Sequence, residues 1–219
     1  MLGSFVEKVR SKENLVIQEF IKGEDIGVEA LFKNGELITY NYAAVLSYMY
    51  SQFSFTTRRT YSRNKEMEAL LATLGKSLGL NGFASIGYIY QPEKKIYYLI
   101  EVDARVNSWM PYGRFTGGDF SEGVRRIANG AYGKENTGPV CPKDKETEIA
   151  IFDRDMRRCI KYKDLKGIAN WIFNHKGYWR FIPFYDFKLL RKILKKMLYD
   201  LFKVQYYSYR VRQFFSKSK

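Results

Sequence analysis

The stretch from Tyr97 to Arg105 constrains the fold most, because it begins as an apolar, aromatic-rich run and ends in charges at alternate positions. Such a run predicts a buried strand. Successive side chains on a strand point to opposite faces, so Glu101, Asp103 and Arg105 are expected to share one face. Two carboxylates about 7 Å apart can hold a hard cation, and a nearby arginine can grip a phosphate. The pattern suggests a metal–phosphate site, and a solvated strand face with a surface ion pair explains it about equally well.

The composition is that of a globular protein of one domain or two small ones. Of the 219 residues, 46% are hydrophobic, 27% are charged and 17% are aromatic. No apolar run is long enough to span a bilayer and no signal-peptide core is present, so we expect a cytoplasmic protein. Cys141 and Cys159 lack metal-ligand spacing and are expected to be reduced thiols. The single histidine, His175, is expected at a helix end.

Alternation of apolar and polar residues, with turn residues between the runs, predicts an antiparallel sheet. Asn34-Gly35 is the clearest turn signal, because both central residues of a type I′ hairpin turn need a positive φ. The expected strands are 14–20, 26–33, 36–45, 83–90, 96–103 and 148–152. The expected helices are 64–78, 120–129, 163–174 and 186–203.

Residues 46–63 show no clear period and are expected to form a flexible loop. This segment carries Arg58, Arg59 and Arg63. Loop arginines are usually solvated surface residues, and we favour that reading over a contact with substrate or phosphate.

The order of these elements resembles the C-terminal half of the ATP-grasp family of ATP-dependent carboxylate–amine and carboxylate–thiol ligases. Two motifs carry the resemblance, which covers about residues 13–125. Gln18-Glu19-Phe20-Ile21-Lys22-Gly23-Glu24-Asp25 resembles the hinge strand of the family. Glu101-Val102-Asp103-Ala104-Arg105 resembles its metal-binding Glu-x-Asn-x-Arg motif. The resemblance implies the fold of the second ATP-grasp subdomain.

The first motif implies a nucleotide-binding role. Backbone groups of Glu19 and Ile21, on either side of Phe20, would hydrogen-bond the adenine edge. Gln18 would lie near the exocyclic amine, and Asp25 would hold the ribose hydroxyls. The resemblance therefore implies ATP as a ligand of this strand.

The second motif implies a phosphoryl-transfer role. Glu101 and Asp103 would hold Mg²⁺, or Mn²⁺ in its place, on the ATP phosphates. Arg105 would be the catalytic residue that steadies the transferred phosphoryl group or the acyl-phosphate. A small carboxylate would attack the γ-phosphate, and an amine would then attack the acyl-phosphate.

The sequence departs from the family pattern at three places. Gly87 stands where the preceding strand usually carries a third carboxylate or an amide, and Asp103 replaces the usual asparagine. The phosphate-binding lysine and Gly-rich loop of the first subdomain do not precede residue 13. We therefore expect the C-terminal part of a ligase. It would work with a separate N-terminal subdomain or as a homo-oligomer, or be a nucleotide-binding remnant without turnover.

The end of the chain is much more basic than the rest of the sequence. Residues 176–219 carry 12 Lys and Arg against 2 Asp and Glu, so they hold +10 of the net charge of +14. The helix expected at 186–203 has an apolar and a basic face. It is expected to pack on the domain. The alternatives are an anionic membrane surface at residues 186–215, peripheral to the inner face of the membrane, and nucleic acid, which is the least favoured.

The sequence thus predicts an α+β protein with an antiparallel sheet and flanking helices. Residues 1–150 are expected to form the ATP-grasp C-terminal subdomain, and residues 151–219 a helical, basic and aromatic tail. The expected function is the ATP- and Mg²⁺-binding part of a carboxylate–amine ligase.

Overall fold

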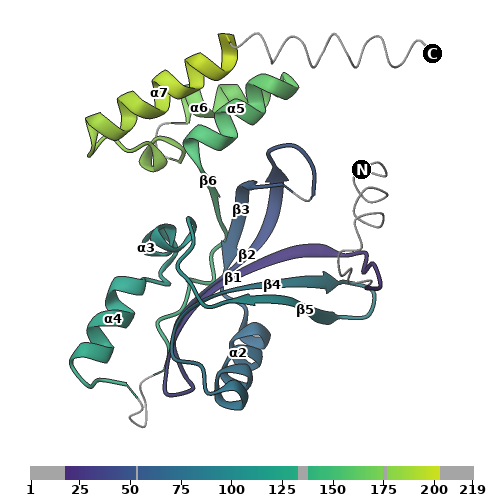
Figure 1. Cartoon of the computed structure of the whole chain (residues 1–219), viewed down its shortest axis with the longest axis vertical. Coiled ribbons are helices and arrows are strands. Elements are labelled where there is room, and N and C mark those ends of the chain that lie inside the picture. Colours follow the sequence, from purple (N-terminus) through teal and green to yellow (C-terminus); the bar gives the residue numbers. More distant parts are fainter. Residues whose placement is uncertain (1–17, 53, 133–137, 175–176, 203–219) are drawn as a thin grey trace, which may run out of the picture.

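The computed structural model describes residues 18–52, 54–132, 138–174 and 177–202, and it is an α+β structure built on one sheet (Figure 1). The strands are β1 (Glu24–Lys33), β2 (Glu36–Tyr48), β3 (Thr56–Ser62), β4 (Gly82–Gln91), β5 (Ile96–Asp103) and β6 (Thr147–Ala150). The α-helices are α2 (Lys65–Leu78), α3 (Gly113–Thr116), α4 (Phe120–Ala128), α5 (Phe152–Tyr162), α6 (Leu165–Phe173) and α7 (Phe187–Phe202). Short 3₁₀ turns are η1 (Met110–Tyr112) and η2 (Trp179–Phe181).

These strands form a six-stranded sheet in the order β5-β4-β1-β2-β3-β6, with every neighbouring pair antiparallel. The predicted hairpin between β1 and β2 is confirmed, since Asn34 and Gly35 have φ values of 51° and 81°. The predicted helix after β3 is confirmed as well. Asn64 accepts a hydrogen bond from the Met67 amide at 2.8 Å, and Gly79 ends α2 in the left-handed region.

The core is divided between the two faces and one end of the sheet (Figure 1). Helix α2 covers one face, where Met67 and Leu71 pack against the even-numbered residues of β1 and β4. Helix α4 covers part of the other face, where Phe120 packs near Leu31. Helices α5, α6 and α7 gather at the end of the sheet marked by β6, around the buried ring of Trp171. The face of β1, β4 and β5 that is turned away from α2 carries the acidic side chains of Glu101 and Asp103.

The prediction of a loop over residues 46–63 is wrong. Strand β2 continues to Tyr48, and β3 pairs with both β2 and β6. Arg58 and Arg59 belong to β3 and are largely buried, because each forms an ion pair with a carboxylate that is distant in sequence. The sequence of β3 does not alternate between apolar and polar residues, because its largely buried side chains include arginines held in ion pairs. Hydrophobic alternation therefore does not identify this strand.

Three other expectations are corrected. Of the strand expected at 14–20, residues 14–17 lie outside the described residues and 18–20 are not in a strand. Strand β5 is exposed instead of buried, because it forms an edge of the sheet and its apolar residues Leu99 and Ile100 face solvent. Helix α5 was not expected, since charged residues dominate its sequence. His175, which was expected at a helix end, lies outside the described residues.

The two cysteines are free, as expected, and they differ in their surroundings. Cys159 lies on the buried side of α5, and this burial raises the pKa of its thiol to about 11. A thiol with so high a pKa is a poor nucleophile at neutral pH. In the described part of the chain, no helix is long and apolar enough to cross a membrane.

A buried carboxylate, Asp155, joins the sheet to the helical end. It is fully buried and accepts hydrogen bonds from Arg58 Nε at 2.9 Å, Arg158 Nε at 2.9 Å and Trp171 Nε1 at 2.7 Å. Thr57 Oγ1 donates a fourth bond at 3.2 Å. The network links β3, α5 and α6 through one side chain.

Replacing Asp155 by Ala leaves two arginines and an indole N–H without their acceptor inside the protein. Removing one partner of a buried ion pair costs about 3–5 kcal/mol, so we expect a loss of that size in the free energy of unfolding. Chemical denaturation of both proteins measures it. The control Asp144→Ala removes an exposed acid and is expected to change stability little. Equal stability of the two variants would contradict the network.

Asp164 is expected to contribute to the loss of folding stability at acidic pH. The hydrogen bond from Arg158 Nη2, at 2.7 Å, lowers the pKa of this carboxyl below its ordinary value of 3.8. The ionised form therefore stabilises the fold above that pH, and the contribution is lost as the pH falls through the lower folded value. Asp164→Asn keeps the cap of α6 and removes the charge. We expect a flatter decline of the melting temperature between about pH 5 and pH 2 than in the wild type.

Candidate functional site

The predicted acidic residues converge on the face of the sheet turned away from α2. The register places Glu101 opposite Gly87 and Asp103 opposite Ser85. Gly87 in turn lies opposite Gly27, and Ser85 opposite Glu29. Residues directly opposite each other in an antiparallel pair point to the same face. Glu101 and Asp103 therefore share this face with Glu29, as well as with Asp25, which lies four positions before Glu29 on β1.

A pair of glycines forms the floor of the site. A Cβ atom on Gly27 would lie 2.5 Å from Arg59 Nη1, and one on Gly87 would lie 3.1 Å from Glu101 Cγ. The Arg59 guanidinium and the Glu101 side chain thus cover neighbouring glycines. The ion pair of Arg59 is with Glu29, at 2.8 Å. Because the two glycines have no side chains, the Arg59 guanidinium and the Glu101 carboxylate can both lie close to the backbone of the sheet.

A buried polar network of residues from β1, β3, β4 and the segment after β5 lies beside this floor. The Glu29 side chain is 1% exposed and accepts hydrogen bonds at Oε1 from Arg59 Nη1 and from Asn107 Nδ2, at 2.8 and 3.0 Å. Asn107 Nδ2 also donates to Ser85 Oγ at 2.8 Å. The guanidinium of Arg59 stacks over the Trp109 ring at 4.5 Å. Within the described structure, Glu29 Oε2 is buried and has no hydrogen-bond partner.

The sequence did not point to Glu29 or Asn107, and for Arg59 it favoured a solvated loop residue over a contact with substrate or phosphate. One signal was available, because Glu29 is an acid in an otherwise apolar strand and shares the parity of Asp25. The partner of Glu29 was hidden by the wrong assignment of residues 46–63 to a loop. Asn107 follows Arg105 by two positions, and only the fold shows that it turns back to the sheet.

Arg105 follows the end of β5 and pairs with Asp103. Its Nη2 donates to Asp103 Oδ2 at 2.8 Å, and the arginine side chain is 74% exposed. An exposed ion pair of this kind is worth about 0–1 kcal/mol, so the guanidinium can leave the carboxylate at little cost. The structure thus contains the surface ion pair that was the alternative to a metal–phosphate site. The exposed Arg105 side chain can still turn toward a ligand.

The nucleotide-binding positions are less regular than expected. Gln18, Glu19, Phe20 and Ile21 are described but are not part of a strand, and the Phe20 side chain is exposed. Asp25 lies in β1 and accepts a short hydrogen bond at Oδ2 from the Tyr48 hydroxyl. Burial, followed by this bond to Asp25, raises the pKa of Tyr48 well above 10.0, so the phenol stays protonated and keeps donating. The structure does not bring Gln18–Ile21 into the sheet.

The donor set on this face suits Mg²⁺. Carboxylate oxygens are its preferred protein ligands, and it commonly takes one or two of them and keeps several waters. Glu101 is exposed and Asp103 is half-buried, so both can reach a solvated ion. Among the residues that the structure describes, no group of three His, Cys, Asp or Glu side chains could hold a metal. A metal here would depend on two carboxylates, water and the oxygens of a ligand.

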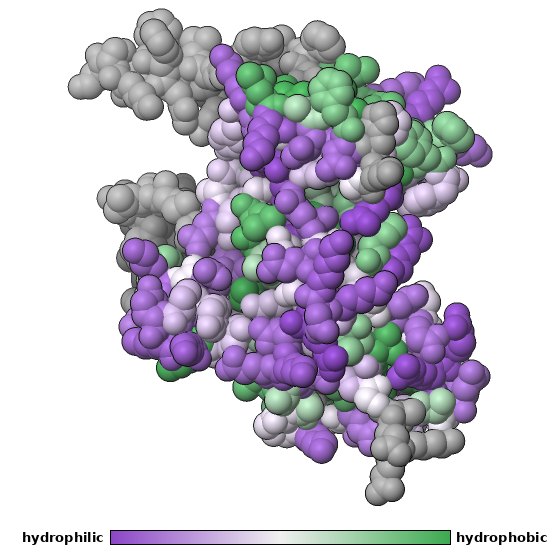
Figure 2. Space-filling view, turned by 180° about the vertical axis from the view of Figure 1, so that it is seen from behind, coloured by the Kyte–Doolittle hydropathy of each residue, from purple (hydrophilic) through white to green (hydrophobic). Residues whose placement is uncertain are grey.

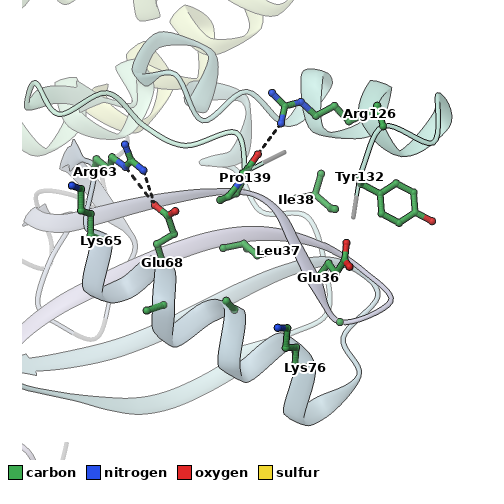
Figure 3. A pocket seen from close by; sticks show the side chains of 15 residues that line it. Glu36, Leu37, Ile38, Arg63, Lys65, Glu68, Lys76, Arg126, Tyr132 and Pro139 are labelled. Atoms are coloured by element: carbon green, nitrogen blue, oxygen red, sulfur yellow. Dashed lines mark hydrogen bonds and ion pairs between the residues drawn. The ribbon is translucent and has the colours of Figure 1, made fainter. Parts of the chain in front are cut away.

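A groove lies elsewhere, beside the first half of β2 (Figure 3). It has a volume of about 630 Å³ and runs between α2 and the segment around Pro139. Arg63 and Arg126 project toward it, but Arg63 is paired with Glu68 and Arg126 donates to the Gly138 carbonyl. None of the predicted site residues lines this groove.

A smaller cavity of about 190 Å³ begins at Ser108, directly after Asn107, and reaches the helical end. Its wall includes Arg114 and Arg180, whose guanidinium groups stack on the Phe115 ring at 4.7 and 5.5 Å. Desolvation lowers the pKa of Arg180 from 12.5, but the group remains charged at neutral pH. Two guanidinium groups beside aromatic rings suit a small carboxylate.

Residues 2–108 match the model of the ATP-grasp domain family. Residues 2–108, just under half of the chain, therefore belong to the ATP-grasp domain family, as the resemblance of the two motifs indicated. No curated protein sequence matches the chain.

Several solved structures are similar to part of this chain. The biotin carboxylase domain of 2-oxoglutarate carboxylase from Hydrogenobacter thermophilus is 16% identical, with a TM-score of 0.43 over 58% of this chain and 29% of that one. Biotin carboxylase from Campylobacter jejuni is 13% identical, with a TM-score of 0.45 over 61% and 31%. N5-carboxyaminoimidazole synthase from Aspergillus clavatus is 10% identical, with a TM-score of 0.41 over 58% and 34%. This chain thus spans about a third of the length of each of these structures.

The network beneath the glycine floor can be tested through stability. Glu29→Gln keeps the shape of the side chain but leaves the Arg59 charge without its buried partner. Because removing one partner of a buried pair is costly, we expect a loss of about 3 kcal/mol in the free energy of unfolding by denaturant titration. Glu122→Gln, which breaks an exposed pair with Arg125, is the matched control and should cost about 1 kcal/mol or less. A loss no larger than that of the control would show that Glu29 and Arg59 are not coupled.

Proposed function

We propose that this chain is the ATP- and Mg²⁺-binding part of a ligase that activates a carboxylate as an acyl-phosphate for attack by an amine. The observation that carries the proposal is the acidic face itself. Glu101 and Asp103 point to the same side of β5, beside a floor of two glycines with Arg59 at its far edge. The family match over residues 2–108 supports ATP as the nucleotide.

Each residue has a role that follows from its position. Glu101 and Asp103 would hold Mg²⁺ between the sheet and the phosphates, with water in the coordination places that the missing side chain of Gly87 leaves open. When bound, the ion supplies charge neutralisation at the phosphate oxygens. Arg105 would exchange Asp103 for the γ-phosphate, since its present ion pair is exposed. The structure of the Hydrogenobacter domain holds MgADP, ADP and bicarbonate.

The chemistry would proceed in two balanced steps. A carboxylate oxygen of the substrate attacks the γ-phosphorus of ATP, and the bond to the β–γ bridging oxygen breaks with release of ADP. The amine nitrogen then attacks the acyl carbon, inorganic phosphate leaves, and the nitrogen loses a proton to solvent. The chain contributes positioning and electrostatic stabilisation to these steps, through Arg105 and the two carboxylates.

The nucleotide contact is proposed at the start of β1. Asp25 would accept from the ribose hydroxyls after exchanging the Tyr48 hydroxyl. Backbone groups of Glu19 and Ile21 would bind the adenine edge, with Phe20 and Gln18 beside it. These four residues lie outside the sheet, so they are available to pair with a ligand instead of a strand. An N-terminal subdomain on another part of the protein would close over the nucleotide.

The double variant Glu101→Ala, Asp103→Ala tests the metal site. Neither side chain belongs to the core, so the fold should survive, as circular dichroism would show. We expect the Mg²⁺-dependent part of nucleotide affinity to fall by at least about tenfold in calorimetric titrations with and without Mg²⁺. A control pair, Glu66→Ala with Glu93→Ala, removes the same charge from exposed positions away from this face. If the first pair binds Mg–ATP as tightly as the control pair, the assignment is wrong.

A further inference from the structure

Exposed apolar side chains gather at the helical end of the molecule. Figure 2 shows hydrophobic residues among hydrophilic ones over the upper end of the molecule, where Figure 1 places α5, α6 and α7. The large side chains exposed there include Leu165, Phe173, Phe184, Tyr185, Phe187, Leu189, Leu194, Leu198 and Tyr199. Large apolar side chains left exposed in one region commonly mark a binding surface.

Helix α7 buries only half of its apolar face. Leu190, Ile193 and Met197 pack into the core around Trp171, as the packing interpretation of the sequence expected. A second stripe, made of Phe187, Leu194 and Leu198, remains exposed. These residues are spaced by seven and four positions, so they form one line along the helix beside the packed stripe. The core of this chain therefore does not account for the apolar pattern of α7.

The exposed stripe has a basic sector along its other side. The cations of this sector are all exposed: Lys188, Arg191, Lys192, Lys195 and Lys196. Residues 187–199 contain no Asp or Glu. Residues 203–219, outside the described residues, continue this composition, with five Lys and Arg, five Tyr and Phe, and no acid. The surface of α7 is thus apolar along one line and strongly positive beside it.

We propose that this face of α7 docks on the surface of a lipid bilayer that contains anionic phospholipids. Phe187, Leu194 and Leu198 would enter the interface between headgroups and acyl chains, and the lysines would contact the headgroups. Charge complementarity selects this occupant. A second copy of the chain would bring a net charge of +14 against the same basic sector. Nucleic acid would use the cations but would leave the aliphatic stripe in water.

The test uses the full chain and vesicles of two compositions, one of phosphatidylcholine alone and one with phosphatidylglycerol added. We expect co-sedimentation with the anionic vesicles and at least tenfold weaker binding to the neutral ones. Raising the salt concentration should weaken the binding without abolishing it, because the apolar stripe remains inserted. Equal binding to both compositions, or binding to neither, overturns the proposal.

Two variants separate the apolar from the electrostatic part. Leu194→Gln with Leu198→Gln should lower vesicle binding at least tenfold and leave stronger salt dependence in what remains. Lys192→Glu with Lys195→Glu should lower it at least tenfold at low salt. Matched controls come from α2, another amphipathic helix with exposed residues. Leu70→Gln with Leu78→Gln, and Lys65→Glu with Lys76→Glu, should bind like the wild type.

A nucleic-acid arm decides between the two classes of partner. The same proteins are titrated with a duplex DNA and a single-stranded RNA of arbitrary sequence. Tight binding there with a steep log-linear salt dependence, unaffected by Leu194→Gln with Leu198→Gln and accompanied by no vesicle binding, would replace the proposal with a nucleic-acid surface. Melting temperatures of all variants show whether a loss of binding reflects unfolding.

Discussion

Two neighbouring arginines on β3 connect the parts of this protein. Successive side chains of a strand point to opposite faces, so Arg58 and Arg59 reach in different directions. Arg59 pairs with Glu29 in the middle of the sheet, and Arg58 pairs with Asp155 of α5. Charges are buried in proteins only when they are paired, so each pair fixes the position of its strand or helix. The sheet and the helical end are thereby held to the same short strand.

The site depends on the first of these pairs. Because Glu29 holds Arg59 over Gly27, a positive group stands at one edge of the glycine floor while Glu101 stands at the other. Asn107 ties the chain after Arg105 back to the same carboxylate. The acidic strand end, the arginine and the loop beyond the motif are therefore positioned by one buried glutamate. Arg59 and Glu29 are thus held in place before any ligand binds, which is the condition for preorganised electrostatic stabilisation.

Local chemistry made much of the sheet predictable. Asn34-Gly35, the Asn64 cap and the Gly79 terminus all depend on neighbouring residues, and each was found where it was expected. The resemblance of Glu101–Arg105 to the ATP-grasp motif agrees with the match of residues 2–108 to the ATP-grasp domain family. Prediction failed where stability comes from partners distant in sequence. Strand β3 and helix α5 are polar segments that become buried only by pairing with each other, and a period in hydrophobicity cannot show this.

A register shift within β5 directs the side chains of its two halves to opposite faces of the sheet. Tyr97 and Glu101 are four positions apart, and in a regular strand they would point to the same face. In the structure the register shifts between Gly87 and Tyr88, and Ile100 has no partner on β4. Tyr97 consequently packs against Tyr88 and Tyr90 on the α2 side, whereas Glu101 faces the glycine floor.

A β-bulge of this kind re-aims a side chain and also twists an edge strand away from pairing with another chain. One inserted residue thus lets a single strand serve the core with its first half and the acidic face with its second. Without the bulge, the aromatic packing that anchors β5 and the placement of its carboxylates would be incompatible.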